Sequence, residues 1–376
     1  MRENESFFRR QLQSLCGLAL LSPILRLIPG SAAEQAGRAA WAAPLLALPV
    51  LLLYAWALSR LRRRMQEGES LPDFALRALG ARLGRGFLLL LGGGLLLYCA
   101  FSLRAGADRF LVTVYPRSAA ANFVIPMGLL ALLAALGPLK SLLRAARMAE
   151  PLLLSVLLVL LLAGLWAADW TELMPLTPAD AGLLLRGSWP SLDIATFGLA
   201  AYFFFLPGQP REKGTFRRKA GLLALFPLGL TLLGAAVQGR FGAPLCARLS
   251  APFFALVRNL VFFRSLERVE ALVVGLWILP DFLLTGLCLQ AAQRCLRLAC
   301  GYSPQPGERR LDFANGRWLI WLGGLAAIGL GLVLAPEPAS LLFWSRRLIP
   351  ALSLSAALLI PGLLFLSLIL IPDRKL

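Results

Sequence analysis

Long apolar segments without charged residues constrain this chain more than any other feature of its sequence. A helix needs about 20 apolar residues to cross the roughly 30 Å hydrocarbon core of a membrane. Seven uncharged segments reach or approach that length, and three further apolar segments contain charged residues, which predicts ten spans. The predicted spans lie near 11–28, 39–59, 86–103, 118–139, 151–168, 190–207, 220–239, 266–292, 318–336 and 348–372.

The overall composition agrees with burial in lipid. Of the 376 residues, 58% are hydrophobic and only 15% are charged, which is more apolar than soluble domains. No polar stretch is long enough to separate soluble domains. We therefore predict an all-α polytopic membrane protein, with residues 1–376 forming a single integral membrane domain and no removable signal peptide.

The basic residues orient the predicted spans. The net charge of +18 does not indicate nucleic-acid binding, because the Arg and Lys residues are distributed over short loops. With the amino terminus inside, the inner segments hold 25 of the 38 Lys and Arg residues. The positive-inside rule therefore predicts that both termini are cytoplasmic.

The sequence offers little for catalysis, cofactors or metals. Histidine is absent, so the commonest metal ligand and proton shuttle at neutral pH is missing. The six cysteines form no CxxC pair and lie in or beside apolar segments, which predicts buried thiols without a metal. Gly-rich phosphate loops and nucleophile elbows are also missing, so we expect neither an enzyme nor a cofactor.

Ten spans suggest two inverted halves of five, because many transporters are built in this way and bind substrate at broken helices. The first span contains Gly17 and Ser22-Pro23, and the sixth contains Gly198. We predict that the two spans depart from regular helix near Leu21–Pro23 and near Gly198, with the breaks facing each other. The alternative is that glycine and proline are simply frequent in membrane helices.

Charged residues inside a membrane require a partner or a function. Asp193 starts the sixth span, where a solvated interfacial carboxylate is the alternative to a functional one. Asp281 follows Pro280 within the eighth span and could face a cavity. Glu270 shares a helical face with Glu267, and a structural charge cluster near the membrane surface is the alternative there.

Two further residues are interpreted by their side-chain chemistry. Tyr98 in the third span has an apolar ring and a polar hydroxyl, so it could contact a ligand, although a core aromatic is the alternative. Glu150 opens the fifth span behind Arg144 and Arg147, which predicts an ion pair at the interface.

Several segments resemble the endospore germination permeases, the multi-pass B subunits of nutrient germinant receptors. The string Ser265-Leu266-Glu267-Arg268-Val269-Glu270-Ala271-Leu272, followed by Gly275-Leu276-Trp277, is similar to the family's ERIE-then-W pattern. Five other segments resemble the family in the same order, so the similarity extends from about residue 10 to 295. They are Ala36-Gly37-Arg38-Ala39-Ala40-Trp41, Leu79-Gly80-Ala81-Arg82-Leu83-Gly84, Arg147-Met148-Ala149-Glu150, Met174-Pro175-Leu176 and Phe197-Gly198.

This resemblance implies a fold of the amino acid–polyamine–organocation type with a ligand pocket between the first and sixth spans. The residues expected at this pocket are Gly17, Leu21, Ser22, Pro23, Tyr98, Phe197, Gly198 and Leu199. The family typically has a Gly-Glu pair in the sixth span, whereas this chain has Gly198-Leu199. An apolar ligand group is therefore expected next to Leu199.

The resemblance also implies the inner membrane of a bacterial spore and assembly with a receptor A subunit and a lipoprotein C subunit. We predict a subunit that binds a small nutrient, such as an amino acid, and signals to these partners by a conformational change. An amino acid transporter coupled to protons or sodium through a carboxylate such as Asp281 is the main alternative. A membrane-embedded enzyme acting on lipid is a third reading.

Overall fold

The computed structural model describes residues 2–113, 115–174, 176–208, 216–260, 269–302, 316, 318–334 and 338–370. Within these ranges the regular structure is entirely helical. Seven helices are long and apolar enough to cross a membrane, and α4 (Ala121–Leu136) and α12 (Trp318–Val333) are shorter apolar helices. The predicted polytopic all-α fold is thus confirmed, whereas the exact number of ten spans remains a prediction.

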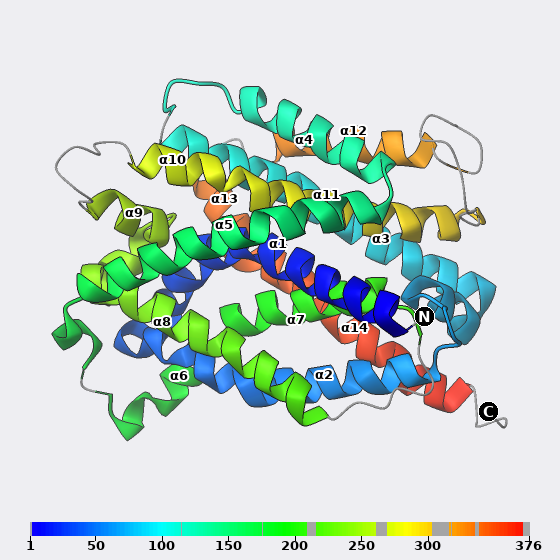
Figure 1. Cartoon of the computed structure of the whole chain (residues 1–376), viewed down its shortest axis with the longest axis horizontal. Helices are drawn as coiled ribbons and strands as arrows, with labels where there is room; N and C mark the ends of the chain where they lie inside the picture. Colours follow the sequence, from blue (N-terminus) through cyan, green and yellow to red (C-terminus); the bar gives the residue numbers. More distant parts are fainter. Residues whose placement is uncertain are drawn as a thin grey trace.

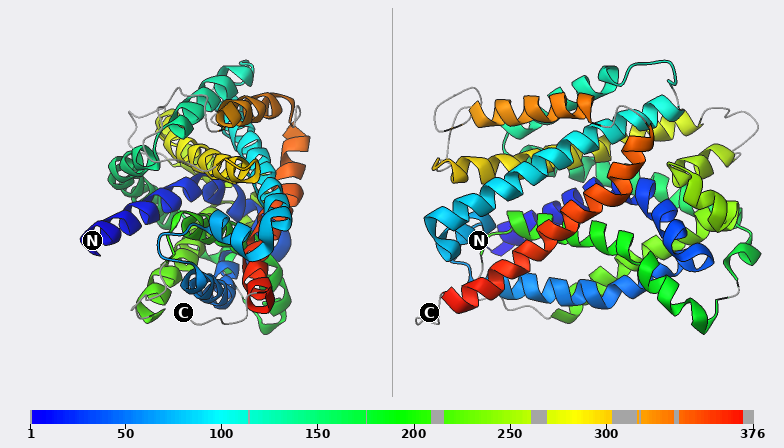
Figure 2. Two further views of the ribbon diagram at one scale, coloured as in Figure 1. Left: turned by 90° about the vertical axis from the view of Figure 1, so that its right-hand side faces the viewer. Right: turned by 180° about the vertical axis from the view of Figure 1, so that it is seen from behind.

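Two groups of helices lie on opposite sides of the first helix, α1 (Arg2–Ala36) (Figures 1 and 2). The α3 group consists of α3 (Leu71–Thr113), α4, α10 (Val269–Leu276), α11 (Ile278–Ala299) and α12. The α7 group consists of α2 (Ala47–Arg64), α6 (Ala181–Gly187), α7 (Trp189–Phe205), α8 (Phe216–Arg248) and α14 (Ile349–Leu370).

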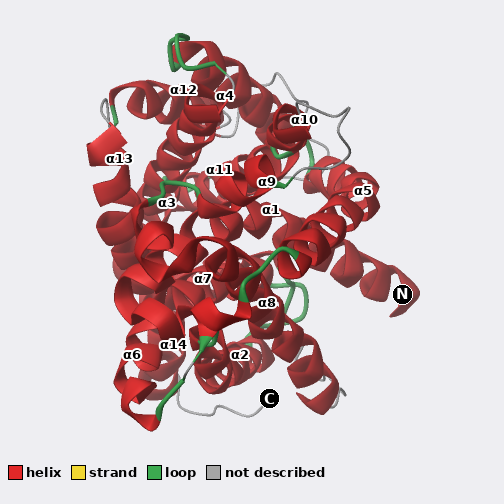
Figure 3. Ribbon diagram, turned by 90° about the vertical axis from the view of Figure 1, so that its left-hand side faces the viewer, coloured by secondary structure: helices red, strands yellow, loops and turns green. Residues whose placement is uncertain are grey.

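α1 is central because it contacts both groups. It packs against α7 and α8 on one side and against α11 on the other. It also contacts α5 (Leu139–Trp166) and α9 (Pro252–Asn259), which Figure 3 shows around it from one end of the bundle. The α13 helix (Pro338–Phe343) and a π-helical turn, Trp344–Leu348, lead into α14.

The predicted breaks in the first and sixth spans are not where the sequence suggested. α1 is one helix from Arg2 to Ala36 with Pro23 and Pro29 inside it, and α7 passes through Gly198 without interruption. Proline removes one hydrogen bond from a helix but does not end it where neighbouring helices hold the segment. The interruption near the sixth span lies instead at Ser188, between α6 and α7.

Two other helices are broken, each at a glycine with positive φ. α3 changes direction at Gly80 (φ 75°) and α8 at Gly242 (φ 69°), a backbone region that favours glycine. The segment of α3 before Gly80 lies against the bundle through Phe74, Ala75 and Ala78. The break therefore separates a short docking segment of α3 from its long apolar part.

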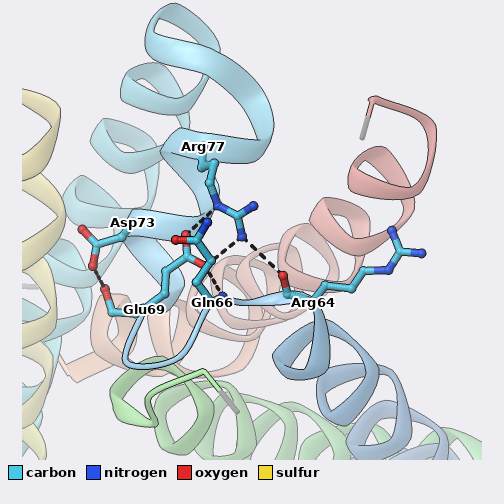
Figure 4. A network of polar contacts seen from close by, with 6 residues as sticks. Arg64, Gln66, Glu69, Asp73 and Arg77 are labelled. Carbon is cyan, nitrogen blue, oxygen red and sulfur yellow. Dashed lines mark hydrogen bonds and ion pairs between the residues drawn. The ribbon is translucent and has the colours of Figure 1, made fainter. Parts of the chain in front are cut away.

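The loop between α2 and α3 is held by a polar network (Figure 4). The guanidinium of Arg77 donates to both carboxylate oxygens of Glu69, at 2.9 and 2.8 Å, and to the Arg64 carbonyl. The backbone N–H of Gln66 donates to Glu69 at 2.7 Å. Gly208, just after α7, donates its N–H to the Glu69 carbonyl at 2.8 Å, so the network joins this loop to the end of α7.

The start of α1 and the end of α14 lie at the same end of the bundle (Figures 1 and 2). The loop between α2 and α3 lies at this end as well, and we call it the N-terminal end. Its basic residues were the basis for predicting a cytoplasmic location, which remains a prediction.

Candidate functional site

A cavity of about 390 Å³ lies on the side of α1 that faces the α7 group, and we call it the main cavity. Four helices form its walls, because α1, α2, α7 and α8 all contribute side chains. Its lining residues are Arg9, Gln13, Cys16, Gly17, Leu20, Leu51, Ala55, Ser59, Arg62, Ala195, Gly198, Leu199, Tyr202, Phe203, Leu206, Leu223 and Phe226.

Glycines shape the main cavity in two different ways. A Cβ atom added to Gly198 would lie 2.2 Å from Cδ1 of Leu20, so α1 and α7 approach closely because position 198 has no side chain. A Cβ added to Gly17 would meet no atom within 4 Å, so Gly17 faces open space. One glycine therefore permits helix packing and the other leaves room for a ligand.

The cavity is polar at one end and apolar at the other. Arg9 and Gln13 lie near the start of α1, and Ser59 and Arg62 lie near the end of α2, which is antiparallel to it. The remainder of these two helices, together with Gly198 and Leu199, presents small or aliphatic groups farther into the bundle.

Arg62 is fixed at the polar end. Its residue is only 3% exposed, and its Nε donates to the carbonyl oxygen of Pro207 at 2.8 Å. Pro207 lies two residues after the end of α7 and precedes Gly208, which pairs with the loop shown in Figure 4. The guanidinium is therefore positioned by the same contacts that join α2 to the end of α7.

A second cavity of about 370 Å³ lies on the side of α1 that faces α5. It shares Gln13 and Gly17 with the main cavity and also contains Leu21. The predicted ion pair of Glu150 is confirmed here, because Arg147 lies 2.5 Å from its carboxylate. α1 therefore forms a partition between two cavities around Gly17.

A buried ion pair connects α1 to the α3 group. Asp281 of α11 forms an ion pair with Arg109 of α3 and accepts a hydrogen bond from the hydroxyl of Ser22 in α1. The Arg109 guanidinium also lies over the ring of Phe254, 5.2 Å from its centroid. The sequence suggested that Asp281 could face a cavity; its side chain is 3% exposed and pairs with Arg109.

Two other predicted residues lie together in the core. The ring of Tyr98 in α3 stacks on Phe197 of α7 with centroids 4.7 Å apart, and both side chains are buried. Asp193, one turn before Phe197, is 5% exposed instead of solvated at the interface. Its carboxylate contacts the hydroxyl of Ser353, while its Oδ1 has no hydrogen-bond partner among the described residues.

The predicted site residues thus belong to several places. Gly17, Gly198 and Leu199 line the main cavity, and Leu21 lines the second cavity beside Gly17. Ser22, next to Pro23, belongs to the ion-pair cluster. Glu270 is the second residue of α10, and its side chain lies outside the described residues.

Sequence reasoning missed the polar end of the main cavity. Arg9, Gln13, Gly17 and Leu20 recur at helical spacing along α1, and Ala55, Ser59 and Arg62 do so along α2. These stripes, polar at one end and small or apolar at the other, were the signal that could have found them. The positive-inside count treats Arg62 as one of several basic residues in a loop.

The prediction that the cysteines are buried is confirmed for five of the six. All six cysteines are free, and five of them are buried, whereas Cys300 is exposed. No group of three or more His, Cys, Asp or Glu side chains in the described ranges could hold a metal ion.

Comparisons with known proteins identify a family from the sequence and a fold from the structure. The family model described as "Spore germination protein" matches residues 12–298. A solved structure of a Na⁺-coupled sialic acid symporter, in a substrate-bound outward-open state, has a TM-score of 0.53 and 10% sequence identity. The match covers 97% of this chain and 87% of the symporter, which shows that the two share the inverted-repeat transporter fold. No curated protein matches the sequence.

Proposed function

We propose a function that starts from the family: this chain belongs to the spore germination protein family. In this proposal the chain is the membrane subunit of a spore germinant receptor. It binds a small nutrient, such as an amino acid, in the main cavity and signals to an A subunit and a lipoprotein C subunit. It lies in the inner membrane of the spore with both termini in the cytoplasm.

The main cavity is the observation that supports this proposal. Its volume of about 390 Å³ is within the range of roughly 300–1,000 Å³ that is usual for small-molecule sites. It lies between α1 and α7, the helices of the two predicted halves that contact each other at Leu20 and Gly198. A ligand there touches both helices and can favour one arrangement of them over another, which is sufficient for signalling.

A binding experiment with a blocked cavity tests the proposal. The full chain in lipid nanodiscs is titrated with a panel of nutrient amino acids, and the Gly17→Leu variant is compared with it. The larger side chain enters open space, so binding is expected to disappear while the melting temperature stays unchanged. Gly93→Leu is the matched control, because Gly93 lies in α3, also faces open space and lines neither cavity. Equal binding by wild type and Gly17→Leu would contradict the assignment of this cavity.

Coupled transport is the second candidate function, and Asp193 is the observation that favours it. Asp193 is buried, and its Oδ1 has no hydrogen-bond partner among the described residues. A buried acid inside a membrane is a candidate site for a transported proton. Asp281 is a poorer candidate than the sequence suggested, because Arg109 already balances its charge. Uptake of labelled amino acids into proteoliposomes, lost in Asp193→Asn, would favour transport. Binding without uptake would favour the receptor.

A further inference from the structure

The charges around the main cavity define the class of ligand more narrowly than the proposed function does. Two arginines line it, Arg9 and Arg62, and its lining includes no Asp or Glu among the described residues. Among the described lining residues, a ligand carboxylate therefore meets complementary charge and a ligand ammonium meets like charge.

The arginines are placed to bind a carboxylate. Arg62 is nearly fully buried, and its Nε is already bonded to Pro207, which fixes the plane of the guanidinium. Planar guanidinium groups are the side chains best suited to carboxylates, because their N–H donors match the two oxygens. Arg9 and Gln13 lie across the cavity on α1 and supply further N–H donors.

The opposite end of the cavity fits a hydrocarbon chain. Leu20, Leu51 and Leu199 line it together with Ala55 and Ala195, and none of these side chains has a polar atom. Each methylene group that a ligand buries there raises its affinity by about fourfold.

We propose that the main cavity binds a small aliphatic carboxylate, with its charged group at Arg9 and Arg62 and its chain toward Leu20 and Leu199. The inference rests on the proposed function, because it takes the main cavity to be the nutrient site. It goes further by stating that the carboxylate and the aliphatic chain, and not an amino group, provide the binding energy.

Three ligands with the same carbon branching test this statement. The full chain in phosphatidylcholine nanodiscs is titrated with 4-methylpentanoate, with leucine and with 3-methylbutylamine. The carboxylate is expected to bind at least as tightly as leucine, and the amine is expected not to bind. Binding of leucine without binding of 4-methylpentanoate, or any binding of the amine, would overturn the inference but leave the proposed nutrient site intact.

A complete absence of binding by all three ligands would also overturn the inference. The proposed function is then judged separately, by whether another nutrient binds and is blocked in Gly17→Leu. An anionic lipid has the same chemistry as the proposed ligand, with a charged head and a hydrocarbon tail. The titration is therefore repeated with phosphatidylglycerol in the nanodisc. Loss of 4-methylpentanoate binding there would assign the cavity to lipid and overturn the proposal of a free carboxylate.

Charge-removing variants locate the carboxylate. A hydrogen bond to a charged group is worth enough that Arg62→Gln should weaken 4-methylpentanoate binding by roughly ten- to a hundredfold. Arg62→Lys, which keeps the charge but loses the planar fork, should have a smaller effect. Arg63→Gln is the matched control, since Arg63 is the next residue of α2, is exposed and does not line the cavity.

Arg9→Gln makes the test independent of Arg62, whose contact with Pro207 also supports the fold. Arg9 is half-buried near the start of α1, and Arg9→Gln is expected to weaken 4-methylpentanoate binding more than Arg9→Lys does, with the melting temperature of each variant measured alongside. Unchanged affinity in both Arg9→Gln and a stably folded Arg62→Gln would overturn the inference.

Discussion

The two sides of α1 are held in opposite ways. On the side of the α3 group, Ser22 contacts a buried ion pair between Arg109 and Asp281. On the side of the α7 group, residues of the same helix between Arg9 and Leu20 face a cavity. One side is bound by charge in a dry interior, and the other leaves space unfilled.

This difference separates a fixed part of the helix from a part that can respond to a ligand. Breaking a buried ion pair is costly, so the region around Ser22 moves only together with α3 and α11. Residues facing a cavity make fewer contacts and can be repositioned at lower cost. A ligand in the main cavity therefore acts on the less restrained part of α1.

The largest effect is expected from removing the charge of Asp281. Asp281→Asn removes the carboxylate that pairs with the buried Arg109 guanidinium, which should lower the free energy of unfolding by about 3–5 kcal/mol. Replacing both charges, as Arg109→Met with Asp281→Leu, should recover most of this loss because neither member of the pair is then buried without the other. Steric trapping in a single detergent measures the free energy of unfolding of both variants.

Asp73→Asn is the control for this prediction. Asp73 pairs with Arg294 at 3.4 Å, and both side chains are about 40% exposed, so its loss should cost less than about 1 kcal/mol. Equal losses at Asp281 and Asp73 would show that the ion pair does not fix its side of α1.

The next largest effect concerns the two glycines of the main cavity. Gly198→Val inserts atoms against Leu20 and should lower the free energy of unfolding by about 1–3 kcal/mol. Adding Leu20→Ala to this variant should restore part of the loss. Gly17→Ala adds a methyl group to open space, so its stability should change by less than about 1 kcal/mol, in the direction of higher helix propensity. Thermal denaturation of the three variants gives the comparison, and similar losses at positions 17 and 198 would refute it.

Leu199→Glu changes the chemistry of the cavity rather than its packing. An acid at this position, as the resemblance described above implies for the family, would offset part of the arginine charge and provide a partner for an ammonium group. The preference for 3-methylbutylamine over 4-methylpentanoate should rise by about tenfold or more, equivalent to about 1.4 kcal/mol. Measuring germination or binding with a panel of amino acids, for the wild type and for Leu199→Glu, tests the same change in ligand preference. An unchanged preference in a normally assembled protein would show that residue 199 does not contact the ligand.

The smallest effect is expected from the loop that joins α2 to the end of α7. Glu69→Gln weakens the paired contacts with Arg77, which is partly exposed, so the loss of stability should be no more than about 1 kcal/mol. Hydrogen exchange at Gly208 should become faster, because its N–H donates to the Glu69 carbonyl in the same network. Protection of Gly208 equal to that of the wild type would show that the loop holds the end of α7 without this ion pair.

Much of the fold could be predicted from the sequence, because apolar segments of membrane-spanning length require little further information. The all-helical architecture and the family followed from such segments and from the order of short motifs. The helix breaks were predicted wrongly, because proline and glycine show where a helix can bend and not whether neighbours keep it intact. Pro23 remains within α1, whereas Gly80 and Gly242 mark real breaks.

The candidate site was only partly predictable because its chemistry depends on contacts between distant segments. Gly17, Gly198 and Leu199 were identified and do line the main cavity. The partner of Asp281 was not, since Arg109 lies on another helix and no local spacing connects the two. Arg62 was grouped with its loop neighbours, because the count of basic residues does not distinguish an exposed arginine from a buried one.

The ion pair between Arg109 and Asp281 also sets a condition on biosynthesis. The two residues are about 170 positions apart, from 109 to 281, so α3 leaves the ribosome well before α11. At about 5–20 residues per second, Arg109 is synthesised roughly 10–35 seconds before its counter-charge. During this interval the translocon, water or lipid headgroups must solvate the guanidinium. α3 can therefore reach its final depth in the membrane only after α11 is inserted. Assembly of the whole bundle then depends on this late insertion.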